Sequence, residues 1–453
     1  IKGGWSATFI VPASPAGSHT IDAYGSSTSL SSVPDINFTT NAGISPSRAS
    51  AAPGSSITIT GVGFNAGETG ITVTYDGNPV ASVTSADSTG GWKATFAVPT
   101  SPAGSHTIDA GSPTTLATTI ANITFTVTPG ISASRASAPP GSSITITGSG
   151  FGTTETGIAV TYDGTATTSG ISADASGGWK ASLLVPASPS GSHTLGATGS
   201  SSVSVPGITF TVTSSISINP PNAVPKSSVT ISGSGFGASE TGITVTYDGQ
   251  SIRTVPASPS ADSNGSWKAT FTVPDSAAGS HSISAQGSVT PLTSLSDKGV
   301  NIEAGMLINP ASSYVGATVE VSGSGFAANS PIKFTYDNKD MPASGTTTDA
   351  SGSFSKSITI PQSPKGDHTI KVTDEQNNNK SATFTMESTP PPTPNPLSPG
   401  DGARLGILGD ITPTLKWSGV TDPSSVLYNL QVDTDPDFSH PILDEKDIPG
   451  KSY

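Results

Sequence analysis

The sequence contains no cysteine, and only 11% of its 453 residues are charged. The absence of cysteine excludes disulfide bonds, iron–sulfur ligation and thiol catalysis, as well as zinc sites built on cysteine. It does not assign a compartment, because many exported microbial repeat domains also lack cysteine. No apolar run approaches the roughly 18 residues of a membrane span. No window shows the sustained periodicity of an amphipathic helix.

Positive charge is also scarce: 19 basic residues stand against 32 acidic ones, which gives a formal net charge of −13. This balance argues against a nucleic-acid partner, whose phosphates require a basic face. Glycine (51) and proline (38) are abundant, a bias that also occurs in disordered chains. However, Ile, Val and Thr recur at alternating positions, which indicates a folded chain.

One motif, Pro-Gly-Ser-Ser-Ile-Thr-Ile-Thr-Gly-x-Gly-Phe, occupies residues 53–64 and returns at residues 140–151. Looser copies occupy residues 226–236 and 316–326. A tryptophan and a histidine recur at intervals of 87 or 88 residues. They are Trp5, Trp92, Trp179 and Trp267, and His19, His106, His193, His281 and His368. This period is close to the ~100 residues of an immunoglobulin-like sandwich, so each period predicts one complete domain.

Apolar and polar residues alternate within each period. In the first complete copy Ile57 and Ile59 alternate with threonines, and Trp92 shares its parity with Ala94 and Phe96. Alternation with a period of two is typical of antiparallel strands that are buried on one face and solvated on the other. We therefore expect seven short strands between residues 44 and 128.

Turn residues punctuate these strands. Asp76-Gly77 after a β-rich run predicts a tight hairpin, because glycine accepts the positive φ of such turns. Gly61 and Gly63 predict a tight loop over the end of the sandwich, with Phe64 as its apolar plug. The fold class predicted is all-β, a tandem array of immunoglobulin-like antiparallel β-sandwiches that form an elongated rod.

The predicted domains follow the period. They are a partial repeat, its back half, at 1–41; repeats at 42–129, 130–213 and 214–303; a divergent repeat at 304–387; a Pro-rich linker at 388–396; and a partial fibronectin type III-like domain at 397–453. The first residues, Ile1 to Trp5, align with the middle of a repeat. We expect either preceding residues or strands from another chain to complete this half-domain. Any membrane anchor is expected outside this segment.

The motif at 53–64 and 140–151 resembles the front half of the IPT/TIG immunoglobulin-like domains of microbial surface proteins. The stretch at 87–108 is similar to bacterial Ig-like adhesin repeats. The segments at 415–417 and 428–432 resemble a bacterial fibronectin type III module. The resemblance implies a secreted or cell-surface structural protein, and the family offers no catalytic motif to transfer.

The recurring histidine is the strongest candidate for chemistry. His106 shares the parity of Ile108, and no acid stands at a fixed spacing within the repeat to join it, so the sequence predicts a structural histidine that satisfies loop backbone groups. Trp92 is predicted in the core rather than stacked on a sugar. Asp76 and Asp87 are predicted to cap turn backbone, since calcium needs six or more oxygens.

Other candidates are interpreted in the same structural way. The cluster of Asp433, Asp435 and Asp437 is predicted to be a solvated loop. A Lys–Asn or Lys–Asp isopeptide bond needs a buried lysine, whereas the lysines after each tryptophan are expected to face outward; these are Lys93, Lys180 and Lys268. Glycosylation sequons occur at a frequency expected by chance, at Asn37, Asn122, Asn264 and Asn379. No catalytic, cofactor-binding or metal-binding residue is assigned, and no cofactor is expected.

The sequence therefore predicts a non-enzymatic structural protein, extracellular and on the cell surface of a microbe. Its role would be a self-associating filament, sheath, S-layer or stalk component that provides reach and cohesion. The partners expected are other copies of the chain, which form a homo-oligomer or polymer through sandwich edges and faces, with glycans as a further class. Two alternatives stay open: a carbohydrate- or host-binding adhesin stalk, and the accessory arm of a large secreted hydrolase.

Overall fold

The computed structural model describes residues 4–200, 205–342, 345–387, 391–405, 412–422 and 426–453. Over these ranges the chain consists of β-strands, turns and three short 3-10 turns, and no helix in them is long and apolar enough to cross a membrane. The 3-10 turns are η1 (Leu30–Ser32), η2 (Ala117–Thr119) and η3 (Leu292–Ser294). The chain divides into two compact units. The first comprises residues 1–215 with the loops Ser234–Ser239 and Ala261–Ser266, and the second comprises the rest.

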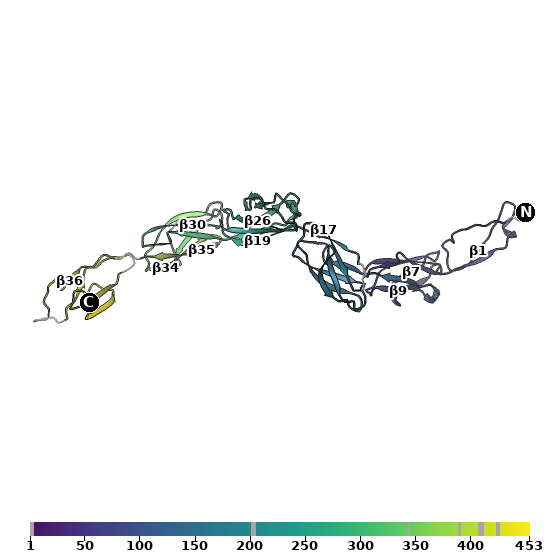
Figure 1. Cartoon of the computed structure of the whole chain (residues 1–453), viewed down its shortest axis with the longest axis horizontal. Helices are drawn as coiled ribbons and strands as arrows, with labels where there is room; N and C mark the ends of the chain where they lie inside the picture. Colours follow the sequence, from purple (N-terminus) through teal and green to yellow (C-terminus); the bar gives the residue numbers. More distant parts are fainter. Residues whose placement is uncertain (1–3, 201–204, 343–344, 388–390, 406–411, 423–425) are drawn as a thin grey trace. The chain divides into compact units, whose positions relative to one another are not determined.

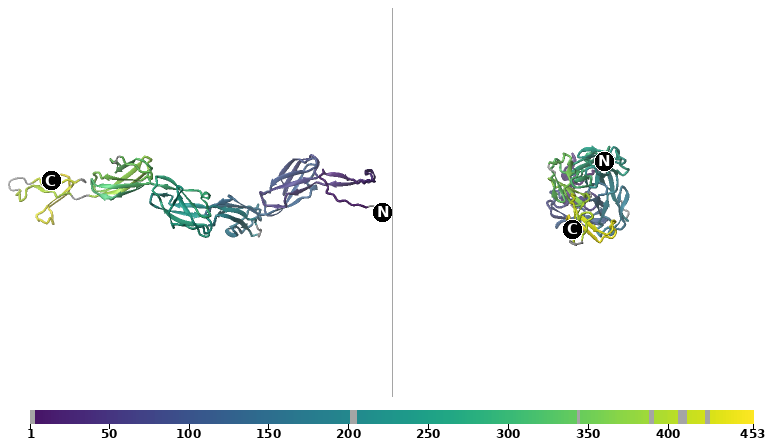
Figure 2. Two further views of the ribbon diagram at one scale, coloured as in Figure 1. Left: turned by 90° about the horizontal axis from the view of Figure 1, so that it is seen from above. Right: turned by 90° about the vertical axis from the view of Figure 1, so that its left-hand side faces the viewer.

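In the first unit, the first full repeat folds as two sheets (Figure 1, Figure 2). One sheet contains β3 (Gly43–Pro46), β5 (Ser56–Val62) and β8 (Trp92–Ala97). The other has the order β4 (Ser50–Ala51), β10 (Ile123–Val127), β9 (Gly104–Gly111), β6 (Thr69–Tyr75), β7 (Asn78–Ser85). Neighbouring strands are antiparallel except β4 and β10, which are parallel. The repeat is thus an immunoglobulin-like sandwich, with the two-residue β4 added to the seven strands predicted.

Alternating burial confirms the strand prediction. Ile57 and Ile59 on β5 are 1% and 0% exposed, and Thr58 between them is half-buried. On β8, Trp92, Ala94 and Phe96 are buried and lie opposite the buried positions of β5. The inward side chains of the two sheets form one hydrophobic core. Burying each such side chain contributes about 1.5–3 kcal/mol, so the apolar parity of the sequence determines which face of each strand turns inward.

Trp92 lies across the backbone of the neighbouring strand. A Cβ atom on Gly61 would lie 2.0 Å from Cε2 of Trp92, so only glycine fits at this place on β5. Phe64, the predicted plug, is 0% exposed and packs edge-on against the indole at a centroid distance of 5.4 Å. The glycine therefore lets the Trp92–Phe64 pair close one end of the core.

The hairpin between β6 and β7 has the geometry predicted from Asp76-Gly77. Both residues have positive φ, 47° and 79°, and Tyr75 pairs with Asn78 across the turn. Two consecutive positive φ values define the turn type that follows the right-handed twist of the strands. The turn places Asp76 directly after β6, with its side chain beside the neighbouring strand β9.

The second full repeat, also in the first unit, has the same strand order. Its first sheet contains β11 (Gly130–Ala133), β13 (Ser143–Ser149) and β16 (Trp179–Leu184). Its second contains β12 (Ser137–Ala138), β18 (Ile208–Val212), β17 (Gly191–Thr198), β14 (Ile158–Tyr162) and β15 (Thr165–Ile171). Trp179 lies over Gly148 as Trp92 lies over Gly61, because a Cβ atom on Gly148 would come within 2.1 Å of the indole.

The second unit holds most of the third repeat. One of its sheets has four strands, β19 (Ser215–Asn219), β21 (Ser228–Ser234), β25 (Trp267–Thr272) and β24 (Thr254–Val255). The other contains β20 (Asn222–Ala223), β27 (Lys298–Ile302), β26 (Gly279–Gln286), β22 (Thr244–Tyr247) and β23 (Gln250–Ile252). The third repeat differs from the first two because β24 crosses to the opposite sheet and pairs with β25.

The fourth repeat, in the second unit, also forms two sheets. They contain β28 (Gly305–Asn309), β30 (Thr318–Ser324) and β33 (Phe354–Thr359), and β29 (Ser312–Ser313), β35 (Asn379–Met386), β34 (Gly366–Asp374), β31 (Ile332–Tyr336) and β32 (Lys339–Asp340). Phe354 takes the place of the tryptophan and packs against Gly323 and Phe326. The domain therefore keeps an aromatic ring over a glycine although the residue type differs.

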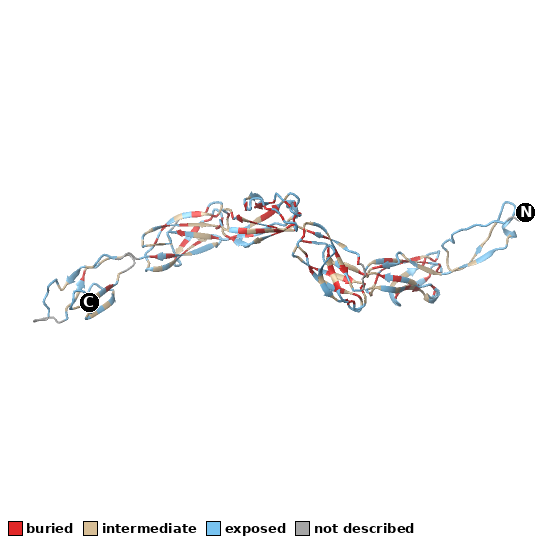
Figure 3. Ribbon diagram, in the orientation of Figure 1, coloured by how far each residue is buried: buried red, intermediate tan, exposed pale blue. Residues whose placement is uncertain are grey.

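The two terminal segments form only small sheets. In the first unit, β1 (Gly17–Ile21) pairs with β2 (Ile36–Thr40), and Trp5 is 76% exposed. In the second unit β36 (Pro396–Ser398) pairs with β37 (Lys416–Trp417), and β38 (Tyr428–Val432) pairs with β39 (Leu443–Ile448). Figure 3 shows buried residues concentrated within the four full repeats and mainly exposed residues in these segments. Residues 1–3, and residues 388–390 of the predicted Pro-rich linker, lie outside the described residues.

Replacing Trp92 with phenylalanine is expected to cost less stability than replacing it with alanine. Trp92→Ala leaves a cavity beside Gly61 and should lower the free energy of local unfolding by about 3–5 kcal/mol. Trp92→Phe keeps a ring against Phe64, as Phe354 does in the fourth repeat, and the indole Nε1 of Trp92 has no hydrogen-bond partner to lose. Hydrogen exchange of the β5 amides in the full chain measures both values. Equal losses for the two variants would contradict this packing.

Candidate functional site

One set of polar residues converges at the Tyr-Asp turn of each full repeat. Tyr75 on β6 pairs with Ile108 on β9, so the end of β6 lies beside His106. The Oδ1 atom of Asp76 accepts a hydrogen bond from the Thr107 N–H at 2.9 Å. Its Oδ2 atom lies 2.7 Å from Nδ1 of His106. Asp76 thus binds both the backbone and the side chain of the neighbouring strand.

The same acid–histidine pair is present in all four full repeats. The other pairs are His193–Asp163 at 2.7 Å, His281–Asp248 at 2.6 Å and His368–Asp337 at 2.6 Å. The prediction that no acid at a fixed spacing joins the histidine was therefore wrong. The acid precedes the histidine by 30 to 33 residues. Strand pairing brings the two together, and the loops between them vary in length, so the spacing is only nearly constant.

Two further contacts hold the imidazole of His106. The ring of Tyr75 stacks on it at a centroid distance of 5.2 Å, and the Tyr75 hydroxyl bonds Oγ of Ser101 at 2.8 Å. The Nε2 atom lies 3.0 Å from the carbonyl oxygen of Pro102, which agrees with the expectation that the ring satisfies loop backbone. We call Tyr75, Asp76 and His106, with their equivalents, the Tyr–His–Asp cluster, and residues 99–104 with their equivalents the Pro loop.

The cluster has the same composition in the other repeats. Each stacks a tyrosine on the histidine at a centroid distance of 5.0 or 5.1 Å. Each also bonds the tyrosine hydroxyl to a serine of the Pro loop. The members are Tyr162, Asp163 and His193; Tyr247, Asp248 and His281; and Tyr336, Asp337 and His368.

Electrostatics favour the ionised carboxylate. Burial acts to raise the pKa of Asp76, but the hydrogen bonds from His106 and Thr107 outweigh it and hold the pKa below its ordinary value. In the fourth repeat the bonds from Thr369 and His368 likewise lower the pKa of Asp337. Burial acts to lower the pKa of His368, but the bond with Asp337 outweighs it and the pKa is raised. Charge and hydrogen bonding therefore reinforce each other in this pair.

The geometry of the cluster suits positioning rather than nucleophilic chemistry. In a Ser-His-Asp triad the histidine accepts the proton of the nucleophilic serine. Here Oγ of Ser101 bonds the Tyr75 hydroxyl, and Nε2 of His106 faces the Pro102 carbonyl instead. Both ring nitrogens are thus engaged by groups that do not react. The cluster ties the Asp76 turn to the Pro loop.

A second carboxylate, which the sequence analysis did not single out, holds another loop. Glu68 is only 6% exposed. It accepts hydrogen bonds from the Asn65 N–H at 2.7 Å and from the Thr115 N–H and hydroxyl at 3.0 and 2.9 Å. The Ser112 and Thr114 hydroxyls also donate to it. Burial acts to raise the pKa of Glu68, but these bonds lower it to about 2.

The Glu68 arrangement recurs and had a signal in the sequence. Glu240 accepts bonds from the N–H groups of Val289 and Thr290, both at 2.6 Å. Glu-Thr-Gly occurs at residues 68–70, 155–157 and 240–242, one copy in each of the first three full repeats. A repeated acid in a chain with few acids could have been identified from this motif. Its buried position could not, because it depends on the loop after β9.

Two further acids, Asp87 and Asp433, cap backbone. Oδ1 of Asp87 accepts bonds from the N–H groups of Thr89 and Gly91 at 2.8 and 2.9 Å, as predicted. Asp433 accepts bonds from the N–H groups of Asp435 and His440 at 3.2 and 3.0 Å. Within the described ranges, no three His, Cys, Asp or Glu side chains are grouped so that they could hold a metal ion.

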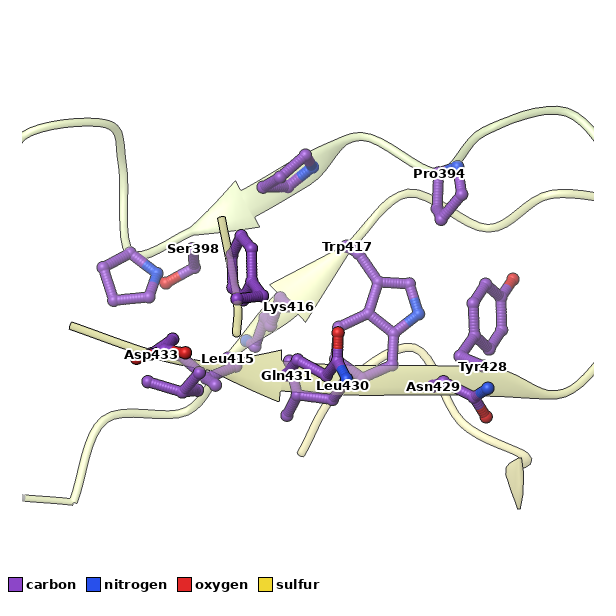
Figure 4. A pocket seen from close by; sticks show the side chains of 14 residues that line it. Pro394, Ser398, Leu415, Lys416, Trp417, Tyr428, Asn429, Leu430, Gln431 and Asp433 are labelled. Carbon is purple, nitrogen blue, oxygen red and sulfur yellow. The ribbon is translucent and has the colours of Figure 1, made fainter. Parts of the chain in front are cut away.

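One hollow lies in the C-terminal segment, between the β36–β37 and β38–β39 sheets. Figure 4 shows Trp417 and Tyr428 beside each other in it, and their ring centroids are 5.4 Å apart. Pro394, Leu415 and Leu430 complete much of the wall. The hollow is therefore mostly apolar, although two charged residues, Lys416 and Asp433, also line it.

Comparison with known families agrees with this architecture. Residues 42–127, 129–212 and 214–298 match the IPT/TIG domain. The chain belongs to the IPT/TIG domain family. The three matched stretches are tandem domains, and each contains one Tyr–His–Asp cluster. A search of curated proteins gave no match.

Three solved structures match this chain at low sequence identity and low TM-score. The adhesin InvE of Yersinia pseudotuberculosis is 16% identical with a TM-score of 0.20, and the match covers 38% of this chain and 58% of that one. Invasin, a bacterial integrin-binding protein, is 15% identical with a TM-score of 0.19, over 77% and 80% of the two chains. The Bacteroides ovatus protein SGBP-B, in complex with a mixed-linkage heptasaccharide, is 14% identical with a TM-score of 0.23, over 65% and 84%. Similarities this low carry no argument about function.

Glu68→Gln is expected to loosen the loop after β9. The pKa of Glu68 is lowered from 4.5 to about 2 in the folded domain, so the ionised carboxylate contributes stability that is fully present above pH 4.5. This stabilisation is lost as the pH falls from 4.5 toward 2. Hydrogen exchange of residues 112–115 in the full chain should be faster in the variant at pH 7, and the difference should shrink in acid. Asp109→Asn, which changes an acid on β9 outside this loop, is the control.

The acid–histidine pair of the fourth repeat should stabilise its domain in a defined pH window. Folding raises the pKa of His368 above its ordinary value of 6.5. The protonated histidine therefore stabilises the domain fully below pH 6.5, and this stability is lost as the pH rises through the pKa of the folded state. Folding lowers the pKa of Asp337 below its ordinary value of 3.8. The ionised carboxylate therefore stabilises the domain above pH 3.8, and this stability is lost as the pH falls through the pKa of the folded state. Protection of the Pro loop at residues 361–366 should therefore be highest between these values. His368→Gln should abolish the alkaline loss of protection, and His440→Gln, at an exposed site, should leave it unchanged.

Proposed function

We propose that this IPT/TIG chain is a structural spacer of a microbial cell surface, which acts by reach and cohesion in a filament, sheath, S-layer or stalk. The proposal rests on the hydrogen-bond partners of the polar side chains. In each full repeat the acids, the histidine and the tyrosine hydroxyl bind groups of their own domain. Among the residues that the structure describes, such a domain presents no convergent charged site for a substrate, and we infer that its contribution is shape.

Bonded boundaries within the units support the spacer role. In the first unit the Ala103 N–H donates to the carbonyl oxygen of Phe151 in the next domain at 3.0 Å. In the second unit the Ala278 N–H donates to the carbonyl oxygen of Phe326 at 2.8 Å. Two residues separate the last strand of one full repeat from the first strand of the next, as between β10 and β11. Short, bonded junctions resist bending better than flexible linkers.

The edges of the sheets support self-association. The edge strands β8 and β16 each carry a lysine, Lys93 and Lys180, and an edge lysine opposes pairing with another chain. The edge strands β7 and β15, in contrast, contain no charged residue. An uncharged edge lacks the charge that opposes pairing with the same edge of another copy. We assign lateral contacts between copies to these two strands.

Lysines placed on the uncharged edges are expected to reduce self-association. Ser82→Lys with Ser169→Lys adds a positive charge at exposed positions of β7 and β15. Sedimentation velocity across a concentration series, with negative-stain images, should show assemblies for the unmodified chain and fewer for the double variant. Thr124→Lys, on the solvated face of the interior strand β10, is the control and should assemble normally. Isolated chains at high concentration for the unmodified protein would rule out self-association.

A further inference from the structure

The Pro loop contacts two partners through one peptide group. The carbonyl oxygen of Pro102 lies 3.0 Å from Nε2 of His106. The N–H of Ala103, on the other side of the same peptide bond, donates to the carbonyl oxygen of Phe151 at 3.0 Å. A peptide group is planar and trans, so fixing the direction of its C=O also fixes the direction of its N–H. His106 therefore orients the donor that binds the next domain.

The receiving loop is shaped for this approach. Gly150, directly before Phe151, has a φ of 70°. A Cβ atom there would lie 2.9 Å from Cδ of Pro53 and 2.9 Å from the carbonyl oxygen of Thr128, so a side chain would clash with the preceding domain. The glycine at this position is thus required by the close contact as well as by the turn. Together with Phe151 it forms the docking point for the Pro loop.

The same arrangement occurs independently in the second unit. Nε2 of His281 lies 2.9 Å from the carbonyl oxygen of Ala277, and the Ala278 N–H donates to Phe326 at 2.8 Å. Gly325, before Phe326, has a φ of 72°, and a Cβ atom there would lie 3.0 Å from Cδ of Pro225. The half-repeat of the first unit repeats the pattern. His19 contacts the Pro15 carbonyl at 2.9 Å, and the Ala16 N–H donates to Phe64 at 3.3 Å.

We propose that the recurring histidine is a positioning residue for docking between successive domains. The Asp76 carboxylate and the carbonyl of Pro102 can only accept hydrogen bonds, so Nδ1 and Nε2 of His106 both donate. Asp76 and the ring of Tyr75 in turn hold the imidazole against β6. The hydrogen bonds run from Asp76 through His106 and the 102–103 peptide to Phe151, and bonds in such a chain polarise one another. The cluster thereby sets the geometry of the junction that follows it.

Spin-label distances across one junction test this proposal. The chain has no cysteine, so Thr124→Cys with Thr209→Cys labels only two exposed, equivalent positions of the first and second full repeats. Pulsed electron spin resonance on the otherwise intact chain should give one narrow distance peak. His106→Gln should broaden this distribution. Ala103→Pro, which removes the donor N–H without altering the cluster, should broaden it in the same way.

The matched control is His193→Gln. It removes the same contacts at the far end of the second domain, so it should cost similar stability and leave the 124–209 distribution narrow. Hydrogen exchange of β6 and β14 checks that both domains stay folded. The proposal is overturned if His106→Gln leaves the distribution narrow while Ala103→Pro broadens it. It is also overturned if His193→Gln broadens the distribution as much as His106→Gln, because the histidine would then act on the fold alone.

Discussion

Carboxylates held by N–H and O–H donors of their own domain organise the loops of this array. The chain has 32 acidic and only 19 basic residues, so side-chain cations cannot neutralise every acid. Glu68, Asp76 and Asp87 instead accept hydrogen bonds from backbone amides, hydroxyls and an imidazole. These bonds fix turns and loops within the domain. The two sheets supply a rigid platform, and the carboxylates place on it the loops by which one domain contacts the next.

The parts of this structure that depend on local sequence could be predicted. The parity of Ile57 and Ile59, the burial of Trp92 and the Asp76-Gly77 turn all follow from residues close in the chain. The Asp76–His106 pair could not be found in this way, because it depends on β6 and β9 being neighbours in the sheet. Strand order is set by the whole sandwich, and one sequence without strand pairings does not reveal it.

The divergent fourth repeat shows which features the fold requires. Phe354 replaces the tryptophan and still covers a glycine. Asn338 replaces the turn glycine with a φ of 64°, a conformation that asparagine tolerates better than most residues. Asp374, at the end of β34, accepts bonds from the Ala327 N–H at 2.7 Å and from the Asn378 N–H at 2.9 Å, so it fixes a loop from a new position. The Asp337–His368 pair, in contrast, is unchanged. The pair also keeps its bonds to the Pro364 carbonyl and the Thr369 N–H, so it still ties the turn to the Pro loop in this repeat.

The near-identity of β5 and β13 has a consequence for how the chain refolds. Both begin Ser-Ile-Thr-Ile-Thr-Gly, and each lies between two strands with equivalent apolar positions. Either strand therefore satisfies the sheet of either domain, and exchanged pairings between adjacent domains compete with the native ones. Order of synthesis removes this degeneracy, because the first domain can close before the second leaves the ribosome. When several domains are unfolded by force and released together, they refold at the same time, and the order of synthesis no longer separates them.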